Sequence, residues 1–168
     1  MASQPIGLYV HIPFCQTKCT YCDFNTYARL EHLIPAYMAA LRNEIECWGY
    51  VLAQPRLETI FFGGGTPSWL PLQSLPMLMN TIRNSFVVPD GIEVTAETNP
   101  GDVSLDKMKA WIDCGITRVS MGVQTFDDKL LSLLTRRHNA AEATASFQQV
   151  RNLGFESVSF DLMYGLPT

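Results

Sequence analysis

Apolar and polar side chains alternate strictly in the stretch Ile92-Glu93-Val94-Thr95-Ala96-Glu97. Two later stretches repeat the pattern, Val119-Ser120-Met121-Gly122-Val123-Gln124 and Val158-Ser159-Phe160-Asp161-Leu162. Successive side chains of a strand point to opposite faces of a sheet, so each stretch predicts a strand with one apolar and one polar face. The polar faces end at Glu97, Gln124 and Asp161, which we expect at the carboxyl ends of neighbouring strands.

Short apolar runs alternate with helical patterns along the chain, which predicts repeated βα units and a parallel sheet. We expect strands at residues 7–12, 58–62, 91–98, 116–123 and 155–163. The first expected helix covers residues 33–52, with an apolar side at Leu33, Tyr37, Leu41, Ile45, Trp48 and Leu52. A second helix starts near residue 75, with Ser74 as its N-cap. A third has Ser104 as its N-cap and stops at Gly115. After a short helical stretch, a further helix covers residues 139–153 and is closed by Gly154.

Two interpretations of the polar strand faces stay open. They could form the solvated face of a half-exposed sheet, or they could line an interior that holds a ligand. Three successive strands that end in a carboxylate or a carboxamide favour the ligand-lined interior, because α/β folds place their sites at the carboxyl ends of strands. The same parity places Tyr9 and His11 together on the first strand.

The composition indicates one globular domain or a piece of a larger one. Of 168 residues, 47% are hydrophobic and 17% are charged, which is enough apolar material for a packed core. The net charge of -4 provides no basic field, so it argues against nucleic-acid binding by bulk charge. No apolar run approaches the roughly 20 residues of a membrane span, and no leader segment is recognisable. We therefore expect a soluble, cytoplasmic protein with no membrane span.

The five cysteines do not have the pattern of a disulfide framework. Their number is odd, and three of them fall within eight positions. Cys47 and Cys114 lie within apolar helical patterns, and we expect both to be buried. The three clustered cysteines indicate a metal or cluster site in a reducing compartment.

The clustered cysteines, Cys15, Cys19 and Cys22, form a C-x3-C-x2-C run without a fourth cysteine nearby. A structural zinc ion would need a fourth protein ligand, for which His11 and Asp23 are the local candidates. A [4Fe-4S] cluster held by three thiolates would keep one iron free for another ligand. The spacing favours the cluster over zinc, and both over unligated thiols.

Five sequence blocks accompany this run. They read YVHIPFC at 9–15, FGGGTP at 62–67, ETNP at 97–100, SMGVQ at 120–124 and DLMYGLP at 161–167. With them, the sequence resembles the radical S-adenosylmethionine superfamily, and within it the branch of oxygen-independent coproporphyrinogen III oxidases and HemW-type heme chaperones. The cysteine run alone indicates the superfamily, whereas the five blocks in this order are specific to the branch. The resemblance covers nearly the whole chain.

The resemblance implies a fold and two cofactors. The fold is the α/β, partial parallel (βα)6 radical-SAM barrel, of which about five βα units are present, so residues 1–168 would be a core domain incomplete at its C-terminus. Cys15, Cys19 and Cys22 would hold the [4Fe-4S] cluster. The positions that would contact S-adenosylmethionine are Tyr9, Tyr21, Gly64, Gly65, Thr66, Glu97, Gln124, Arg136 and Asp161. No catalytic residue beyond these ligands is implied.

Phe24 distinguishes the two members of the branch. The oxidases carry a fourth cysteine two residues after the third, where this chain has Phe24, and they have a longer stretch before the first strand. The resemblance therefore implies a heme chaperone that delivers heme to client hemoproteins. The alternative is an oxidase that decarboxylates a porphyrinogen with a 5′-deoxyadenosyl radical, so enzymatic activity stays open. Either protein would need a reductant for its cluster.

Three histidines are possible axial heme ligands. We expect other environments for each of them: the barrel interior for His11 and the surface for His32 and His138. The sequence therefore assigns no heme ligand.

Overall fold

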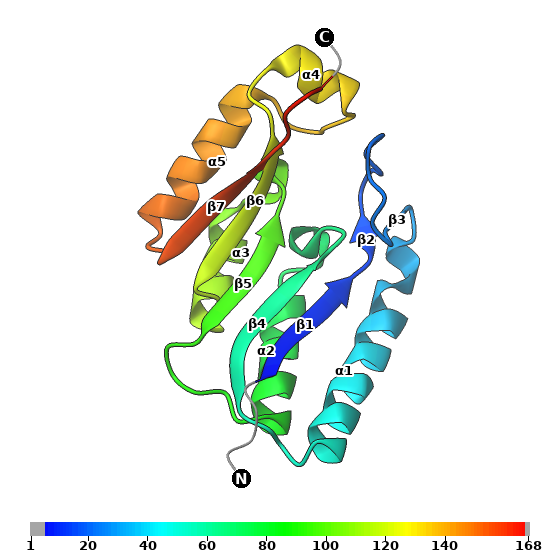
Figure 1. Cartoon of the computed structure of the whole chain (residues 1–168), viewed down its shortest axis with the longest axis vertical. Helices are drawn as coiled ribbons and strands as arrows, with labels where there is room; N and C mark the ends of the chain where they lie inside the picture. Colours follow the sequence, from blue (N-terminus) through cyan, green and yellow to red (C-terminus); the bar gives the residue numbers. More distant parts are fainter. Residues whose placement is uncertain (1–5, 167–168) are drawn as a thin grey trace.

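Five parallel strands form one sheet in chain order in the structure, a computed structural model that describes residues 6–166. They are β1 (Ile6–Ile12), β4 (Leu57–Gly64), β5 (Glu93–Thr98), β6 (Arg118–Gln124) and β7 (Ser157–Leu162). Figure 1 shows this order from β1 to β7 across the sheet. The predicted α/β fold with five βα units is confirmed, and each strand lies within two residues of its expected bounds.

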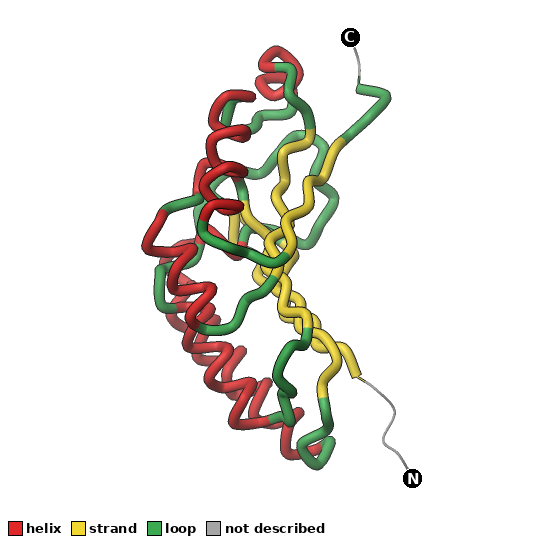
Figure 2. Tube along the Cα trace, turned by 90° about the vertical axis from the view of Figure 1, so that its left-hand side faces the viewer, coloured by secondary structure: helices red, strands yellow, loops and turns green. Residues whose placement is uncertain are grey.

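The helices lie on one side of this sheet (Figure 2). They are α1 (Ile34–Val51), α2 (Ser74–Ser85), α3 (Leu105–Asp113), α4 (Asp128–Leu133) and α5 (Ala140–Asn152), with single 3-10 turns η1 (Glu31–Leu33), η2 (Pro67–Trp69) and η3 (Pro100–Asp102). Two short strands, β2 (Phe14–Cys15) and β3 (Tyr27–Ala28), pair in parallel and close the base of the cysteine loop. Within residues 6–166, no helix is long and apolar enough to cross a membrane.

The two faces of the sheet differ as the alternation predicts. The side chains of Phe62, Val119 and Met121 are fully buried in the core under the helices. The opposite face, which we call the open face, carries the polar residues of the same strands. At its carboxyl end His11 pairs in register with Gly63, and Gly122 pairs with Asp161. Parallel pairing thus brings the predicted strand-end residues to one edge of the sheet.

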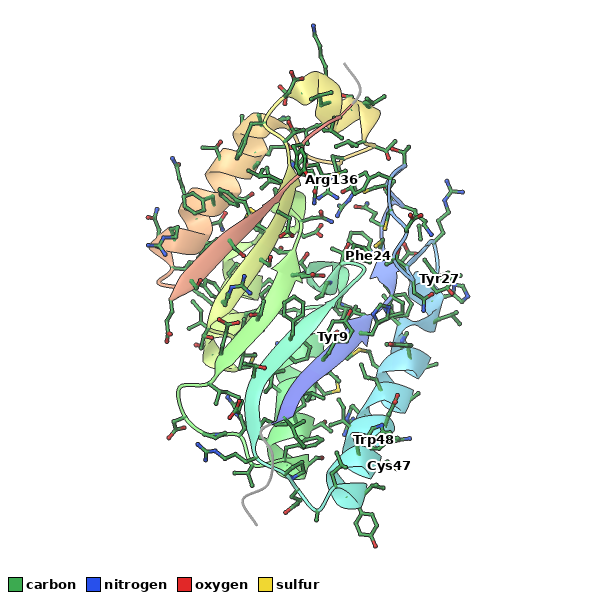
Figure 3. The ribbon with its side chains drawn as sticks, in the orientation of Figure 1. Tyr9, Phe24, Tyr27, Cys47, Trp48 and Arg136 are labelled. Carbon is green, nitrogen blue, oxygen red and sulfur yellow. The ribbon has the colours of Figure 1, made fainter. Side chains whose placement is uncertain are left out.

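Two predictions about α1 are wrong. Cys47 is exposed, and Trp48 is 52% exposed, as are Leu33 and Leu52 in part (Figure 3). Ile45 of the predicted side is buried, but the other buried residues of α1 are Ile34, Met38 and Gly49. At Gly49 α1 lies so close to α2 that a side chain would collide with the backbone of Ser85. Because of this close approach, the side of α1 that faces α2 does not include Trp48. The prediction that Cys114 is buried is confirmed.

Of the two N-caps expected, Ser74 and Ser104, the structure confirms Ser104. Ser104 accepts a hydrogen bond from the Lys107 amide, and Asn139 forms a capping box with Glu142. Gly115 and Gly154 have φ of 95° and 91° and end their helices. Ser74, in contrast, is the first residue of α2 rather than its N-cap. Gln73 occupies the cap position with helical backbone and no side-chain bond, so that prediction is wrong.

Candidate functional site

A cavity of about 530 Å³ lies at the carboxyl end of the sheet, between the strand ends and the cysteine loop. Its lining includes the three clustered cysteines and every residue predicted to contact S-adenosylmethionine except Tyr9. These residues are Cys15, Cys19, Cys22, Tyr21, Gly64, Gly65, Thr66, Glu97, Gln124, Arg136 and Asp161. The fold thus gathers residues from both ends of the chain around one space large enough for a small-molecule ligand.

Each clustered cysteine sulfur has a polar side chain beside it. The pairs are Cys15 Sγ with Thr66 Oγ1 at 3.4 Å, Cys19 Sγ with Arg136 Nη1 at 3.3 Å, and Cys22 Sγ with Thr26 Oγ1 at 3.7 Å. Burial raises the pKa of Cys15, while the hydroxyls of Thr66 and Thr26 act in the opposite direction. A bound metal removes the proton from a coordinating thiol, and the resulting thiolate would accept all of these bonds. Three thiols so supported fit thiolate ligation.

These thiols do not converge on one point. Within residues 6–166, no three His, Cys, Asp or Glu side chains lie close enough together to hold a single metal ion. Single zinc ions take their sulfur ligands at about 2.3 Å from one centre, whereas an iron–sulfur cluster places each thiolate on its own iron.

The backbone at Gly65 lies against the start of the cysteine loop. A Cβ at this position would be 2.7 Å from the carbonyl oxygen of Phe14 and 3.0 Å from Cys15 Sγ. The Gly65 amide donates to the Ile12 carbonyl at 2.7 Å, and the Thr66 amide donates to the Phe14 carbonyl at 2.8 Å. Glycine is therefore needed here so that the loop after β4 can reach the first cysteine.

Arg136 joins the cysteine loop to the strand ends. Its Nη1 donates to Cys19 Sγ and to the hydroxyl oxygen of Tyr21 at 3.4 Å. Its Nη2 donates to Asn99 Oδ1 and to the Gly122 carbonyl oxygen, while its Nε is buried and has no hydrogen-bond partner among residues 6–166. Figure 3 shows this side chain at the carboxyl end of the sheet. Burial raises the pKa of Tyr21 to about 12, although the positive charge of Arg136 acts to lower it.

The neighbouring Arg137 has different partners. It forms an ion pair with Asp102 at 2.9 Å, donates to Gln16 in the cysteine loop, and lies over the Trp69 ring with 5.5 Å to its centroid. It contacts the loop without reaching a cysteine sulfur among the hydrogen bonds of residues 6–166. The two adjacent arginines thus have separate structural roles.

The strand ends contribute an acidic and amide-bearing wall. Glu97 Oε2 accepts from the Gly64 amide at 3.0 Å, and Asp161 Oδ1 accepts from Ser120 at 3.4 Å. Burial raises the pKa of Glu97, and the nearby Asp161 raises it further, against the effect of the Gly64 bond. Gln124 ends β6 with a φ of 71°, beside a register shift in the pairing with β7. A bulge of this kind turns a side chain away from the regular alternation. The wall suits a ligand with hydroxyl or cationic groups.

Tyr9 lies on the open face outside the cavity lining, 56% exposed (Figure 3). Its ring stacks on Phe61 with centroids 6.0 Å apart. Its hydroxyl lies 2.9 Å from His11 Nδ1, and His11 Nε2 lies 2.9 Å from the Asn25 carbonyl oxygen. Because a carbonyl only accepts, Nε2 donates to it, and in the neutral ring Nδ1 then accepts from the Tyr9 hydroxyl. Tyr9 is thus connected to the cysteine loop through His11, and its contact with a cofactor stays a prediction.

Sequence reasoning missed two residues that organise this site. Asn99 donates to Thr66 at 3.3 Å and accepts from Arg136, and Thr26 lies beside the sulfur of Cys22. Both could have been found, because Asn99 belongs to the ETNP block and Thr26 follows the cysteine run. The expectation of a surface position for His138 is wrong. His138 is 5% exposed, and its Nε2 lies 3.2 Å from the Val123 carbonyl oxygen.

Comparison with known proteins agrees with this geometry. The family model described as the Radical SAM superfamily matches residues 9–168. The chain belongs to the radical SAM superfamily. Membership implies a [4Fe-4S] cluster and S-adenosylmethionine as cofactors, which decides between the cluster and the zinc ion that the spacing left open.

Among curated members of this superfamily, the chain is similar to the heme chaperone HemW of Haemophilus influenzae (39% identical, 97% of this chain and 44% of the relative). It is also similar to HemW of Bacillus subtilis (44% identical, 95% and 42% covered). The chain therefore spans less than half the length of these relatives. Among solved structures, the radical SAM enzyme coproporphyrinogen III oxidase (HemN) of Escherichia coli superposes with a TM-score of 0.90 at 34% identity, over 97% of this chain and 38% of that chain. Elp3 of Methanocaldococcus infernus, 18% identical with a TM-score of 0.62, shares the fold.

Proposed function

We propose that the protein is a radical-SAM heme chaperone, which binds a [4Fe-4S] cluster and S-adenosylmethionine and delivers heme to client hemoproteins. The identities of 39% and 44% to proteins named heme chaperone support this function, as does the similarity along nearly the whole chain. The five cysteines are all free, which is consistent with action in the reducing cytoplasm. A one-electron reductant for the cluster would be a further partner there.

The cofactor ligands are part of this proposal. Cys15, Cys19 and Cys22 would hold the cluster, and the cavity residues of the strand ends, together with Tyr9, would hold S-adenosylmethionine. When bound and reduced, the cluster supplies the electron for cleavage of a sulfonium carbon–sulfur bond. The chain's own residues bind and orient: Glu97 and Asp161 accept from hydroxyl or cationic groups, and Gln124 both donates and accepts. The guanidinium of Arg136 lines the cavity and would pair with a carboxylate.

Phe24 is the residue that favours the chaperone over the oxidase. It stands where the oxidases have a fourth cysteine, lines the cavity and is 70% exposed (Figure 3). A phenyl ring supplies neither a thiolate nor a hydrogen-bond donor, so the thiol that the oxidases place beside the cluster is replaced by an apolar surface. An exposed aromatic ring at the rim of a cavity suits contact with a flat apolar ligand. The oxidase stays a second candidate because of the TM-score of 0.90.

Two of the three histidines are already engaged. His11 uses both ring nitrogens, and the ring of His138 is buried against a backbone carbonyl. Either would have to give up hydrogen bonds before it could ligate heme iron. His32 is exposed in η1 and is the candidate among the three that needs no such rearrangement.

The first test uses the full-length protein, reconstituted anaerobically with iron and sulfide, reduced, and incubated with S-adenosylmethionine and coproporphyrinogen III. Porphyrin products are followed by chromatography. The proposal expects no conversion by a protein with an intact cluster. Formation of protoporphyrinogen would instead make the protein an oxidase.

A second test measures the proposed activity directly. Heme-loaded protein is mixed with an apo-hemoprotein, and transfer is followed by the change in the heme absorbance spectrum. We expect the natural protein to transfer heme. The variant Phe24→Cys, which installs the residue of the oxidases, tests whether the aromatic ring matters for this transfer. Absence of both heme binding and porphyrinogen conversion would contradict both candidates.

A further inference from the structure

Arg136 is a cation in direct contact with one of the three clustered sulfurs. The sulfurs of Cys15 and Cys22 have neutral hydroxyls beside them, whereas Cys19 Sγ accepts from a guanidinium at 3.3 Å. We infer that Arg136 raises the reduction potential of the cluster through this bond and fixes the cysteine loop at the same time. The inference rests on the proposed ligation of a cluster by the three cysteines.

The position of the guanidinium is set by the chain itself. On the loop side it bonds Cys19 and Tyr21, and on the sheet side it bonds Asn99 and Gly122. Acceptors on two sides hold the cation in place, so the contact with Cys19 does not depend on a flexible surface side chain. The bond spans 117 residues of sequence and ties the loop to the ends of β5 and β6. Arg136 is therefore a positioning residue for the loop as well as a charge beside it.

The direction of the effect follows from charge. A cluster that gains one electron becomes more negative, and no bond of the protein forms or breaks in that step. A positive hydrogen-bond donor on a ligand sulfur stabilises the more negative state more strongly, and hydrogen bonds to the sulfurs are among the determinants of cluster potential. Partial burial reduces the screening of this interaction by water. Removal of the charge should therefore make the cluster harder to reduce.

The test is a redox titration of the full-length reconstituted protein with dithionite, without S-adenosylmethionine, followed by electron paramagnetic resonance of the reduced cluster. Omission of S-adenosylmethionine separates the effect on the sulfur from any contact between Arg136 and that cofactor. For Arg136→Met we expect the one-electron reduction equilibrium to fall about tenfold, which corresponds to a midpoint lower by about 59 mV. Arg136→Lys keeps the positive charge but lacks the two-pronged guanidinium, so its midpoint potential should lie between those of the natural protein and of Arg136→Met.

Arg137→Met is the matched control. It removes the same charge one residue away and a contact to the cysteine loop at Gln16, but no contact to a sulfur. Its midpoint should equal that of the natural protein. An unchanged midpoint in a fully loaded Arg136→Met protein would overturn the inference, as would an equal shift in both variants.

Two further outcomes have distinct meanings. If Arg136→Met does not retain a cluster, Arg136→Lys decides: a lowered midpoint supports the inference, and a midpoint equal to the natural one contradicts it. If the natural protein itself binds no cluster, the proposed function fails together with the inference, and iron and sulfide analysis identifies that case before any titration.

Discussion

The helix-covered face and the carboxyl edge of the sheet use opposite chemistry within the same strands. Under the helices, Phe62 and Val119 are fully buried among apolar neighbours. At the carboxyl edge, polar side chains such as Glu97 and Arg136 surround a cavity and are held by hydrogen bonds. Burial of apolar area stabilises the first region, whereas the second keeps buried polar groups available for a ligand. Substitutions in the two regions should therefore affect different measurements.

The largest effect is expected at the cysteine loop. Replacement of Cys19 with alanine removes one of three proposed ligands and should abolish cluster binding while the fold is retained. Iron and sulfide content and the visible absorbance measure the cluster, and circular dichroism measures the fold. Cys47→Ala is the control, because Cys47 is exposed on α1, away from the cavity lining. A stoichiometric cluster in Cys19→Ala would refute the ligand assignment.

A substitution in the core should lower the stability of the fold. Trp111 in α3 is 1% exposed, and its replacement with alanine should cost about 3–5 kcal/mol of unfolding free energy, because it leaves a large cavity. Equilibrium unfolding in urea measures this loss. Trp48→Ala provides a control of the same residue type, since its exposed side chain should cost about 0.5 kcal/mol or less. Similar losses for the two variants would contradict the assignment of the core to the helix-covered face.

Glu97 tests the edge without the cysteines. Glu97→Ala should weaken S-adenosylmethionine binding by about one to two orders of magnitude, the range expected for hydrogen bonds to a charged group, and should leave the cluster in place. Titration calorimetry on the reconstituted protein measures the affinity. Glu93→Ala lies four residues earlier on the same strand face, outside the cavity lining, and should bind normally. Unchanged affinity in Glu97→Ala would remove Glu97 from the proposed site.

The sequence was sufficient to predict the strands and their faces and, through the family resemblance, the cysteines and strand-end residues that line the cavity, but not Asn99 or Thr26. Alternation identified the faces because the two-residue period of a strand reports directly on side-chain direction, and Ser104 acts locally as the expected cap. The predictions for Cys47 and Trp48 failed because the side of α1 that is buried depends on how closely α2 approaches at Gly49. Helical spacing alone does not contain that distance.

The contact of Arg136 with Cys19 was likewise beyond sequence reasoning. The family resemblance implied that Arg136 contacts S-adenosylmethionine, and the cysteine spacing predicted a metal or cluster site, but neither pattern indicates a contact between Arg136 and Cys19. Their separation of 117 residues is closed only by the folded strand order and by the path of the cysteine loop. Long-range polar contacts of this kind depend on geometry to within a fraction of an ångström.

The smallest effect is expected from His138, which is buried against the carbonyl oxygen of Val123 in β6. Burial lowers the pKa of His138 from its ordinary value of 6.5, and the positive charge of Arg136 lowers it further. As the pH falls, His138 binds its proton at a higher pH in the unfolded chain than in the folded protein. The stability that the neutral ring contributes is therefore complete above about pH 6.5 and is lost as the pH drops toward the lower folded-state pKa. Thermal unfolding of the natural protein and of His138→Gln between pH 7.5 and 5.5, a range of about two units around that value, measures the effect. The difference between the two proteins should shrink or reverse toward acid, because glutamine does not titrate while carboxylates titrate equally in both. A constant difference across the range would mean that His138 remains neutral in the unfolded chain as well, or that its ring is not desolvated in the folded one.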